Sequence, residues 1–233
     1  MRHRTPLLLV LAGLWLVGSG RASADATRHV DDDAPPGGDG RTWATAYRFL
    51  QDALTEAASQ PEVLEIRVAT GVYRPDRDAA MPEGSGDRAA SFALVDGVAV
   101  RGGYRGVPAD PDEGESPDDR DPDGLPSILC GDLAGDDGPD GLNRAENARH
   151  VVQATGVGPA TTLDGVVVRR GFADGSGNAG RGGGVLLTTG AAPTIVDCVF
   201  REHHAGQGGG LGAIAGGAVW IESCRFELNT ADV

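Results

Sequence analysis

An internal repeat near the C-terminus constrains the fold more than any other feature of the sequence. The segment "GGGVLLTTGAAPTIVDCVFREHHA", from Gly182, aligns without gaps with "GGGLGAIAGGAVWIESCRFELNTA", from Gly208. At this offset of 26 residues both segments keep the triple glycine, and the other identities include Ile195 with Ile221, Cys198 with Cys224, Phe200 with Phe226 and Ala205 with Ala231. A repeat of this length indicates a solenoid, in which each coil packs only against its neighbours.

A second internal match shows what each repeat contains. "DGVAVRGGY" (Asp96–Tyr104) matches "DGVVVRRGF" (Asp164–Phe172), and a further step of 32 residues aligns Val166 and Val168 with Cys198 and Phe200. Each unit therefore holds two apolar residues spaced two apart: Val98/Val100, Val166/Val168, Cys198/Phe200 and Cys224/Phe226, with Ile66/Val68 and Ile128/Cys130 as weaker members. This spacing puts both side chains on one face of a β-strand, whereas a helix needs three or four.

The composition narrows the kind of solenoid. The chain has 37 glycines and only 5% aromatic residues, but no G-X-Y period, which favours turn-rich β structure over collagen. A leucine-rich repeat has a similar length but needs a regular leucine ladder, which this sequence lacks. The sequence therefore predicts an all-β fold, a parallel β-helix of roughly six to seven coils.

The segment before the coils has a different period. In "WATAYRFLQDALTEAAS", apolar residues recur at helical spacing, and they are Ala46, Phe49, Leu50, Ala53, Leu54 and Ala57. We expect residues 25–60 to form a short strand near "RHVD" and an amphipathic helix over 43–58 that caps the first coil. Residues 61–233 then form the coils, with acidic loop excursions at 74–90 and 108–123.

The N-terminus resembles a secretory signal. Basic "MRHR" precedes the apolar run from Leu7 to Val17, and "ASA" ends at Ala24. We expect a signal peptide over 1–24, a secreted or extracytoplasmic protein, and no transmembrane span after its removal. The formal net charge of −14 disfavours nucleic acid and anionic membranes as partners and leaves divalent cations as ligands to consider.

Several motifs resemble a known family. "DDDAPPGGDGRTWATAYRFLQDALTEAA", "EIRVATGVYRPD", "GVAVRGGYRG", "SILCGDLAGDD" and the "GGG…CRFELNTA" units are similar to secreted right-handed parallel β-helix proteins of planctomycete type, with the pectin-lyase-like fold. The pairing of "GGGL" with "FELN" also resembles the repeats of chlamydial polymorphic outer membrane proteins, although "FREH" carries His203 where that motif has Asn. The resemblance implies a right-handed β-helix, and it leaves the activity open because this fold hosts lyases, hydrolases, adhesins and spacers.

Two acidic loops suggest calcium. "DRDPDG" has the spacing of a calcium loop in Asp119, Asp121 and Asp123, but Cys130 stands where a bidentate Glu is needed, so a solvated acidic loop is the other interpretation. "GDLAGDDGPDG" invites the same two interpretations, through Asp132, Asp136, Asp137 and Asp140. No cofactor other than calcium is expected.

Candidates for catalysis are few. Lyases of this fold abstract the proton alpha to a uronate carboxylate, with calcium acidifying that proton and a base, often Arg, removing it. The candidate residues for that chemistry are Arg169, Arg170, Asp174 and Asp197. Asp96 and Asp164 precede Gly in a repeated "DG", which indicates turn chemistry.

Three further residues and two cysteines have competing interpretations. Glu202, His203 and His204 of "REHH" could bind a transition metal, but His203 occupies the column in which Asn satisfies turn backbone. Cys198 and Cys224 fall on adjacent coils, so they either form a disulfide or fill the core as small apolar side chains.

Two functional hypotheses follow. The first is a non-enzymatic secreted or cell-surface β-helix that acts in adhesion, as an envelope scaffold or in contact with glycans, possible partners being a polysaccharide or a cell-surface component. The second is a polysaccharide lyase or glycoside hydrolase, with or without calcium. Because the last unit, from Gly208 to Val233, has no capping element after it, we also expect an uncapped C-terminal coil that could associate end to end with a second copy.

Overall fold

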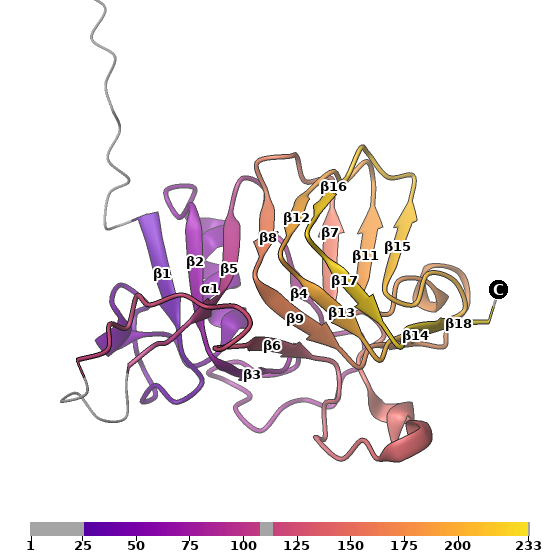
Figure 1. Cartoon of the computed structure of the whole chain (residues 1–233), viewed down its shortest axis with the longest axis horizontal. Helices are drawn as coiled ribbons and strands as arrows, with labels where there is room; N and C mark the ends of the chain where they lie inside the picture. The colour runs from indigo at the N-terminus through magenta and orange to yellow at the C-terminus, as the bar shows by residue number, and fades with distance from the viewer. Residues whose placement is uncertain (1–25, 108–113, 233) are drawn as a thin grey trace, which may run out of the picture.

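Parallel strand pairing dominates the protein. The structure is a computed structural model that describes residues 26–107 and 114–232, so the expected signal peptide and part of the 108–123 loop lie outside the described residues. Every ladder between its named strands is parallel, and only one isolated bridge, between Tyr104 and Arg120, is antiparallel. Figure 1 shows the strands stacked side by side along the long axis.

The strands form four sheets. Sheet A consists of β1 (Thr27–Val30), β2 (Glu65–Ala69), β5 (Ala99–Tyr104), β8 (Thr162–Asp164), β12 (Thr194–Val196) and β16 (Trp220–Glu222). Sheet B consists of β3 (Gly71–Tyr73), β6 (Ser127–Cys130), β9 (Val166–Arg169), β13 (Val199–Arg201) and β17 (Arg225–Glu227). Sheet C consists of β4 (Phe92–Ala93), β7 (Val152–Thr155), β11 (Val185–Thr188) and β15 (Leu211–Ile214). Sheet D consists of β10 (Phe172–Ala173), β14 (His204–Ala205) and β18 (Thr230–Ala231).

The chain visits these sheets in a fixed cycle. It passes from sheet A to B and then to C, and from the fourth coil onward a strand of sheet D stands between B and C. Because each new strand pairs with the strand one coil earlier, the result is a solenoid of parallel β-strands. The prediction of a mostly β, solenoid-like fold is confirmed at this level.

The register of the paired strands confirms one part of the predicted repeat and shows that another part is wrong. Phe200 pairs with Val168 on one side and Phe226 on the other, as predicted. Val100 was expected in the same column, but it lies in sheet A and pairs with Leu163. The expected inward pair Ile128/Cys130 is also displaced, because Ser127 and Leu129 are the residues that pair with Val166 and Val168. The loop between β5 and β6 changes the length of that coil, so sequence similarity no longer marks the same sheet.

Left-handed backbone conformations mark the corner between sheets A and B. Gly165, Asp197 and Ser223 follow paired residues of β8, β12 and β16, and each has a positive φ, of 66°, 51° and 52°. Gly fits this conformation without strain, whereas Asp and Ser adopt it at some cost. The corner column therefore explains the "DG" of Asp164–Gly165 as turn chemistry.

The triple glycines serve two different needs. Gly208 has φ of 66°, a conformation that L side chains rarely adopt. A Cβ on Gly209 would lie only 2.2 Å from the carbonyl oxygen of Thr230. The first glycine therefore makes the turn, and the next lets the backbone of β18, in the following coil, approach closely.

The capping helix is shorter than predicted. Helix α1 spans Leu50–Ser59, and a separate 3-10 turn, η2, covers Trp43–Thr45. Between them the chain is extended, because Tyr47 bridges to Val30 and accepts a hydrogen bond from the amide of Asp31. The expectation of one helix over 43–58 is wrong at its N-terminal half, since backbone pairing with β1 outweighs helical propensity there.

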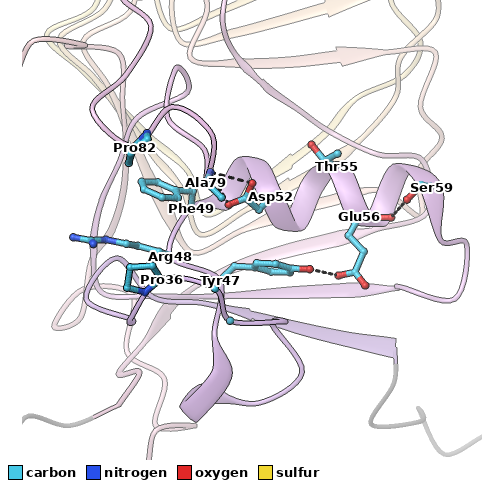
Figure 2. Close-up of a pocket in the computed structure, with 12 residues that line it drawn as sticks. Pro36, Tyr47, Arg48, Phe49, Asp52, Thr55, Glu56, Ser59, Ala79 and Pro82 are labelled. Carbon is cyan, nitrogen blue, oxygen red and sulfur yellow. Dashed lines mark hydrogen bonds between the residues drawn. The ribbon is translucent and has the colours of Figure 1, made fainter.

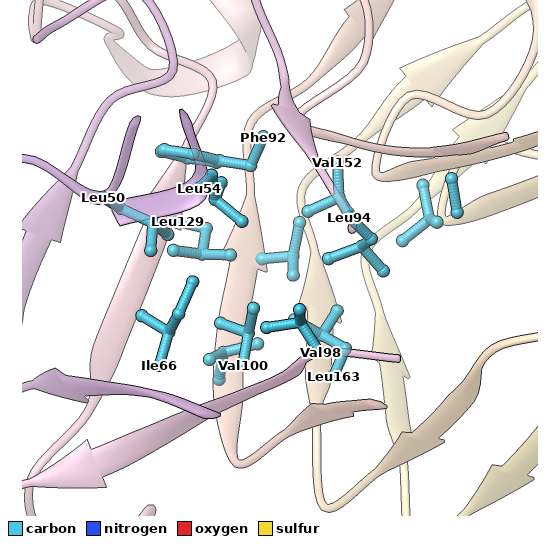
Figure 3. Close-up of a cluster of buried hydrophobic side chains, with 14 of the residues drawn as sticks. Leu50, Leu54, Ile66, Phe92, Leu94, Val98, Val100, Leu129, Val152 and Leu163 are labelled. Atoms are coloured by element: carbon cyan, nitrogen blue, oxygen red, sulfur yellow. The ribbon is translucent and has the colours of Figure 1, made fainter. Parts of the chain in front are cut away.

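The core runs through the interior of the coils. Leu50, Ala53, Leu54 and Ala57 of α1 join the same buried cluster as strand residues such as Ile66 and Val168. Figure 3 shows Leu50 and Leu54 above Ile66 and Leu129. Helix α1 contacts β1, β2 and β4, in the part of the first coil that has no strand of sheet B or C. It therefore covers apolar ends of those sheets, as a cap should.

Apolar side chains are exposed on the coil formed by residues 208–232. Trp220, Ile221, Phe226 and Leu228 are 63%, 44%, 48% and 79% exposed. Packing of a second copy against this coil stays a prediction. In the part of the chain that the structure describes, no helix has both the length and the apolar character to cross a bilayer.

Candidate functional site

A groove lies beside α1, outside the coils. Its apolar half has a volume of about 630 Å³ and is lined by residues that include Pro36, Tyr47, Phe49 and Pro82. Figure 2 shows Phe49 and Tyr47 beside the helix, from which Asp52 and Glu56 project. We call this feature, together with the polar half described next, the cap groove. An aromatic-lined concavity with a few polar groups is typical of a small-ligand site.

The polar half of the cap groove contains three arginines. This part, of about 390 Å³, shares Arg48, Phe49 and Pro82 with the apolar half and is also lined by Arg74 and Arg77. The Arg48 guanidinium lies 6.0 Å from the Phe49 ring centroid. Arg77 Nε is buried and has no hydrogen-bond partner among the described residues. Asp32, Asp33 and Glu83 line the same half, so the groove offers both donors and acceptors.

Two carboxylates on one face of α1, those of Asp52 and Glu56, have pKa values shifted in opposite directions. Burial raises the pKa of Asp52, and its two oxygens accept long hydrogen bonds from the amide of Ala79. The Arg28 guanidinium holds the pKa of Glu56 below its usual value. Burial, assisted by the neighbouring Glu56, raises the pKa of Tyr47 to about 12, so its hydroxyl stays protonated and donates to Glu56 Oε2 over 3.0 Å.

Buried polar contacts fix the walls of the cap groove. Arg28 is 1% exposed and contacts Glu56 with two nitrogens, Nε to Oε2 at 2.6 Å and Nη2 to Oε1 at 2.8 Å. This bidentate pair ties α1 to β1. On the other side of the helix, Gln51 Nε2 donates to the carbonyl oxygens of Pro75 and Ser91, which holds both ends of the 74–90 loop.

The structure does not bring the candidate catalytic residues together. Asp174 pairs with Arg88 at 2.8 Å, and Arg170 pairs with Glu202 and Asp132. Asp197 is exposed at a corner between β12 and β13. Arg169 lies on β9 with its Nε buried and unpartnered. Among the described residues, no hydrogen bond or ion pair joins Arg169, Asp174 and Asp197.

The first expected calcium loop is also dispersed. Asp119, Asp121 and Asp123 are exposed, and the described residues do not include them in a converging group of metal-ligating atoms. Asp119 lies 3.7 Å from Arg105 Nε, and Asp123 Oδ1 accepts from Arg225 Nη2 at 3.0 Å. These contacts fit the interpretation as a solvated acidic loop.

The second acidic loop is more ordered. Asp132 is 1% exposed, and one oxygen each from Asp132, Asp136 and Glu146 lie within 4.8 Å of one another. Burial, together with the charges of Asp132 and Asp137, raises the pKa of Glu146 to about 7. Glu146 was not singled out in the sequence, where a lone Glu among "NRAENAR" gives no signal. The side chain of Asp140, the remaining candidate of this loop, lies outside what the structure describes.

The two histidines of "REHH" have separate roles. His203 is fully buried, and its ring bonds two backbone groups of the preceding coil: Nδ1 accepts from the amide of Gly171 and Nε2 donates to the carbonyl of Val168. His204 stacks on Phe172 at 5.0 Å between ring centroids. Both nitrogens of His203 are therefore occupied, which agrees with the turn-satisfying interpretation.

The three cysteines are free thiols. Cys198 is buried and donates towards the carbonyl oxygens of Val196 and Leu163, while Cys224 donates towards Ile195 and Glu222. Burial raises the pKa of Cys198 well above its usual value. The structure therefore shows the space-filling alternative for the stacked pair.

Comparison of the chain with protein-family models, with curated proteins and with solved structures finds no match. The cap groove must therefore be interpreted from its own geometry. Sequence reasoning missed it because Phe49 was assigned to the inward face of a helix. The sequence signal for the groove was "YRF", in which Tyr47 and Phe49 flank Arg48, an arginine that does not recur in the repeats.

Proposed function

We propose that this protein is a secreted or cell-surface right-handed β-helix, of the pectin-lyase-like type, which binds glycans without modifying them. The cap groove is the binding site. The observation that carries the proposal is the position of Arg48 and Arg77 beside Phe49, in the cap groove, with neither guanidinium paired to a described carboxylate.

The chemistry of the groove matches that of a sugar. Phe49 and Tyr47 provide flat apolar surface on which the C–H face of a sugar ring can pack, and Tyr47 adds a polar edge. Guanidinium groups donate to hydroxyl and carboxylate oxygens, and a carboxylate receives two parallel bonds. The unpaired arginines therefore favour a glycan that carries uronate groups over a neutral one.

The location is proposed on sequence grounds alone. The apolar run from Leu7 to Val17, followed by "ASA", resembles a secretory signal. The cap groove does not repeat along the solenoid, as expected for a site added to a scaffold whose coils serve stability.

A second function is favoured by one observation, the carboxylate pair in the groove. Asp52 and Glu56 lie one helical turn apart, and their surroundings shift their pKa values in opposite directions. Pairs separated in this way can serve as acid and base, so a glycoside hydrolase is the alternative. In that case Asp52 would be the proton donor, because burial favours its neutral form.

The test is calorimetric titration of the purified protein with oligogalacturonate and with neutral cello-oligosaccharide. We expect binding of oligogalacturonate, and at least a tenfold loss of affinity in Arg77→Gln and in Phe49→Ala. The matched control is Arg169→Gln, which removes an arginine that has no ion pair and lies away from the groove. Absence of binding in the wild type, or equal losses in the control, would rule the proposal out.

The same mixtures test the enzymatic alternative. Release of reducing sugar that is lost in Asp52→Asn would establish a hydrolase, and absorbance at 235 nm would reveal the unsaturated product of a lyase. With intact oligosaccharides after prolonged incubation, the non-enzymatic proposal stands.

A further inference from the structure

The loop between β6 and β7 contains buried side-chain oxygens that lack donors. Asp137 Oδ1, Glu146 Oε2 and Asn147 Oδ1 are all buried, and none has a hydrogen-bond partner among the described residues. The side chain of Asp137 is 1% exposed, and Asn147 is fully buried. All three atoms are acceptors, so each needs a hydrogen-bond donor or a cation.

The orientation of Asn147 is fixed by its other contacts. Its Nδ2 donates to Asp137 Oδ2 at 2.9 Å and to the carbonyl oxygen of Arg170 at 2.9 Å. Exchanging the amide nitrogen and oxygen would break both bonds, so Oδ1 is the atom without a donor.

A carboxylate cluster lies in the same loop. One oxygen from each of Asp132, Asp136 and Glu146 fall within 4.8 Å of one another. Two oxygens on opposite sides of a calcium ion are about 4.8 Å apart, because Ca²⁺–O distances are near 2.4 Å. The three oxygens can therefore contact one ion simultaneously. Asp137, the residue next to Asp136, is close enough for its charge to act on Glu146, but its oxygens are not among the three that converge.

The loop is held in this shape by donors that bind both oxygens of Asp132. Asp132 Oδ1 accepts from the amides of Gly135 and Asp136, at 2.6 and 3.1 Å, and Arg170 Nη1 lies 3.0 Å from Oδ2. Metal-binding carboxylates are commonly oriented by such hydrogen bonds. Arg170 and Arg144 are the cations nearby. Arg170 Nε lies 3.8 Å from Asp137 Oδ2, but neither arginine donates to the three unpartnered oxygens.

We propose that the loop of residues 132–147 binds one calcium ion, through the carboxylates of Asp132, Asp136 and Glu146, with Asp137 and Asn147 in the surrounding shell. Calcium suits the loop better than magnesium because its coordination is flexible and tolerates several protein oxygens. The proposal is independent of the cap groove, and it places calcium away from the "DRDPDG" loop in which the sequence suggested it.

The test uses the purified chain, dialysed against EDTA and then against metal-free buffer. Titration with CaCl₂ should give one binding event, and calcium at a hundred times Kd should raise Tm by roughly 5 to 10 °C. Asp136→Asn, at an exposed side chain that contributes little to folding, should weaken calcium binding at least tenfold. Glu146→Gln should do the same.

The matched control is Asp121→Asn, which removes an equally exposed carboxylate from the other acidic loop. It should leave calcium affinity and the Tm shift unchanged. If the wild type shows no binding heat and no Tm shift, the buried carboxylates share protons instead of an ion. The proposal also fails if Asp121→Asn abolishes the response, or if Asp136→Asn and Glu146→Gln both retain it.

Discussion

His203 and Asn229 make the same two hydrogen bonds, one coil apart. Asn229 Oδ1 accepts from the amide of His203 at 3.1 Å, and its Nδ2 donates to the carbonyl of Phe200 at 2.8 Å. His203 Nδ1 accepts from the amide of Gly171 at 2.9 Å, and Nε2 lies 3.0 Å from the carbonyl of Val168. In each case the side chain joins its own coil to the corner of the coil before it. Histidine therefore replaces the asparagine of the repeat and keeps both hydrogen bonds to the preceding coil.

This equivalence predicts that His203→Asn is tolerated. Asparagine can present an acceptor and a donor to the same two backbone groups, so the free energy of unfolding should fall by no more than about 1 kcal/mol. His203→Ala leaves both buried groups unsatisfied and opens a cavity, so it should cost about 3 kcal/mol or more. Urea unfolding followed by circular dichroism measures both. Equal costs for the two substitutions would contradict the equivalence.

The presence of a buried histidine at position 203 also predicts that the free energy of unfolding depends on pH. Burial lowers the pKa of His203 from 6.5 to about 3. Between these values the unfolded chain binds a proton that the folded chain does not, so stability is complete above pH 6.5 and falls as the pH decreases towards 3. Relative to His203→Asn, the wild type should lose about 2 kcal/mol between pH 6.5 and pH 5. His29 and His150 also have lowered pKa values, but they are common to both proteins and cancel. If the wild type and His203→Asn lose the same unfolding free energy between the two pH values, the lowered pKa of His203 is contradicted.

The columns of the solenoid could be predicted in the last coils, where the same strand pattern recurs although the step changes from 32 to 26 residues. From Val168 to Phe200 and Phe226, the sequence repeats one strand, and the register agrees. Prediction failed between β5 and β6, because an inserted loop shifts equivalent sequences into different sheets. Similarity of local pattern therefore indicates a β-strand with an inward face, but it does not by itself show which sheet that strand joins.

The candidate site could not be predicted in the same way. The cap groove is made from residues that occur once, and the ion pairs that shape it join residues far apart, such as Arg28 and Glu56. Periodicity identified the apolar face of α1 correctly at Leu50 and Leu54, but it extended the helix over Tyr47 and Phe49. Backbone pairing with β1 competes with helix formation at Tyr47. The sequence around Tyr47 does not reveal this competition, because the pairing depends on a strand some twenty residues earlier.

Cysteine reactivity should differ sharply between the three thiols. Cys130 and Cys198 are buried, whereas Cys224 is half-buried, and contact with Cys198 lowers its pKa to about 7. Thiolate is the reactive form, so iodoacetamide at pH 8 should label Cys224 first in the native protein. Peptide mass spectrometry measures the order of labelling, with Cys224→Ser as the control that removes the fast site. A loss of two mass units and no fast labelling would instead establish the disulfide between Cys198 and Cys224.

Asp164 should anchor the loop that precedes β6. Its carboxylate is 6% exposed and pairs with Arg101 and, at 2.6 Å, with Arg120. Asp164→Asn removes the charge while keeping the shape, so we expect a loss of about 2 kcal/mol and faster tryptic cleavage after Arg120. Asp197→Asn is the matched control, because Asp197 is exposed and follows the strand residue that pairs with Asp164. Similar cleavage rates for the two variants would show that the pairs contribute little.

The buried contact between Arg28 and Glu56 should decide whether the cap groove keeps its shape. Glu56→Gln removes the carboxylate that contacts the guanidinium of Arg28, which is 1% exposed, and breaking a buried ion pair typically costs about 3–5 kcal/mol. Tyr47→Phe removes only the hydrogen bond to Glu56 and should cost about 1 kcal/mol. Because Arg28 holds the pKa of Glu56 below its usual 4.5, this stabilisation is present above that pH and is lost as the pH falls further. The difference in unfolding free energy between wild type and Glu56→Gln should therefore shrink between pH 6 and pH 3. Urea titrations at both values measure it, and a difference that does not change with pH would show that Glu56 acts through packing rather than through its charge.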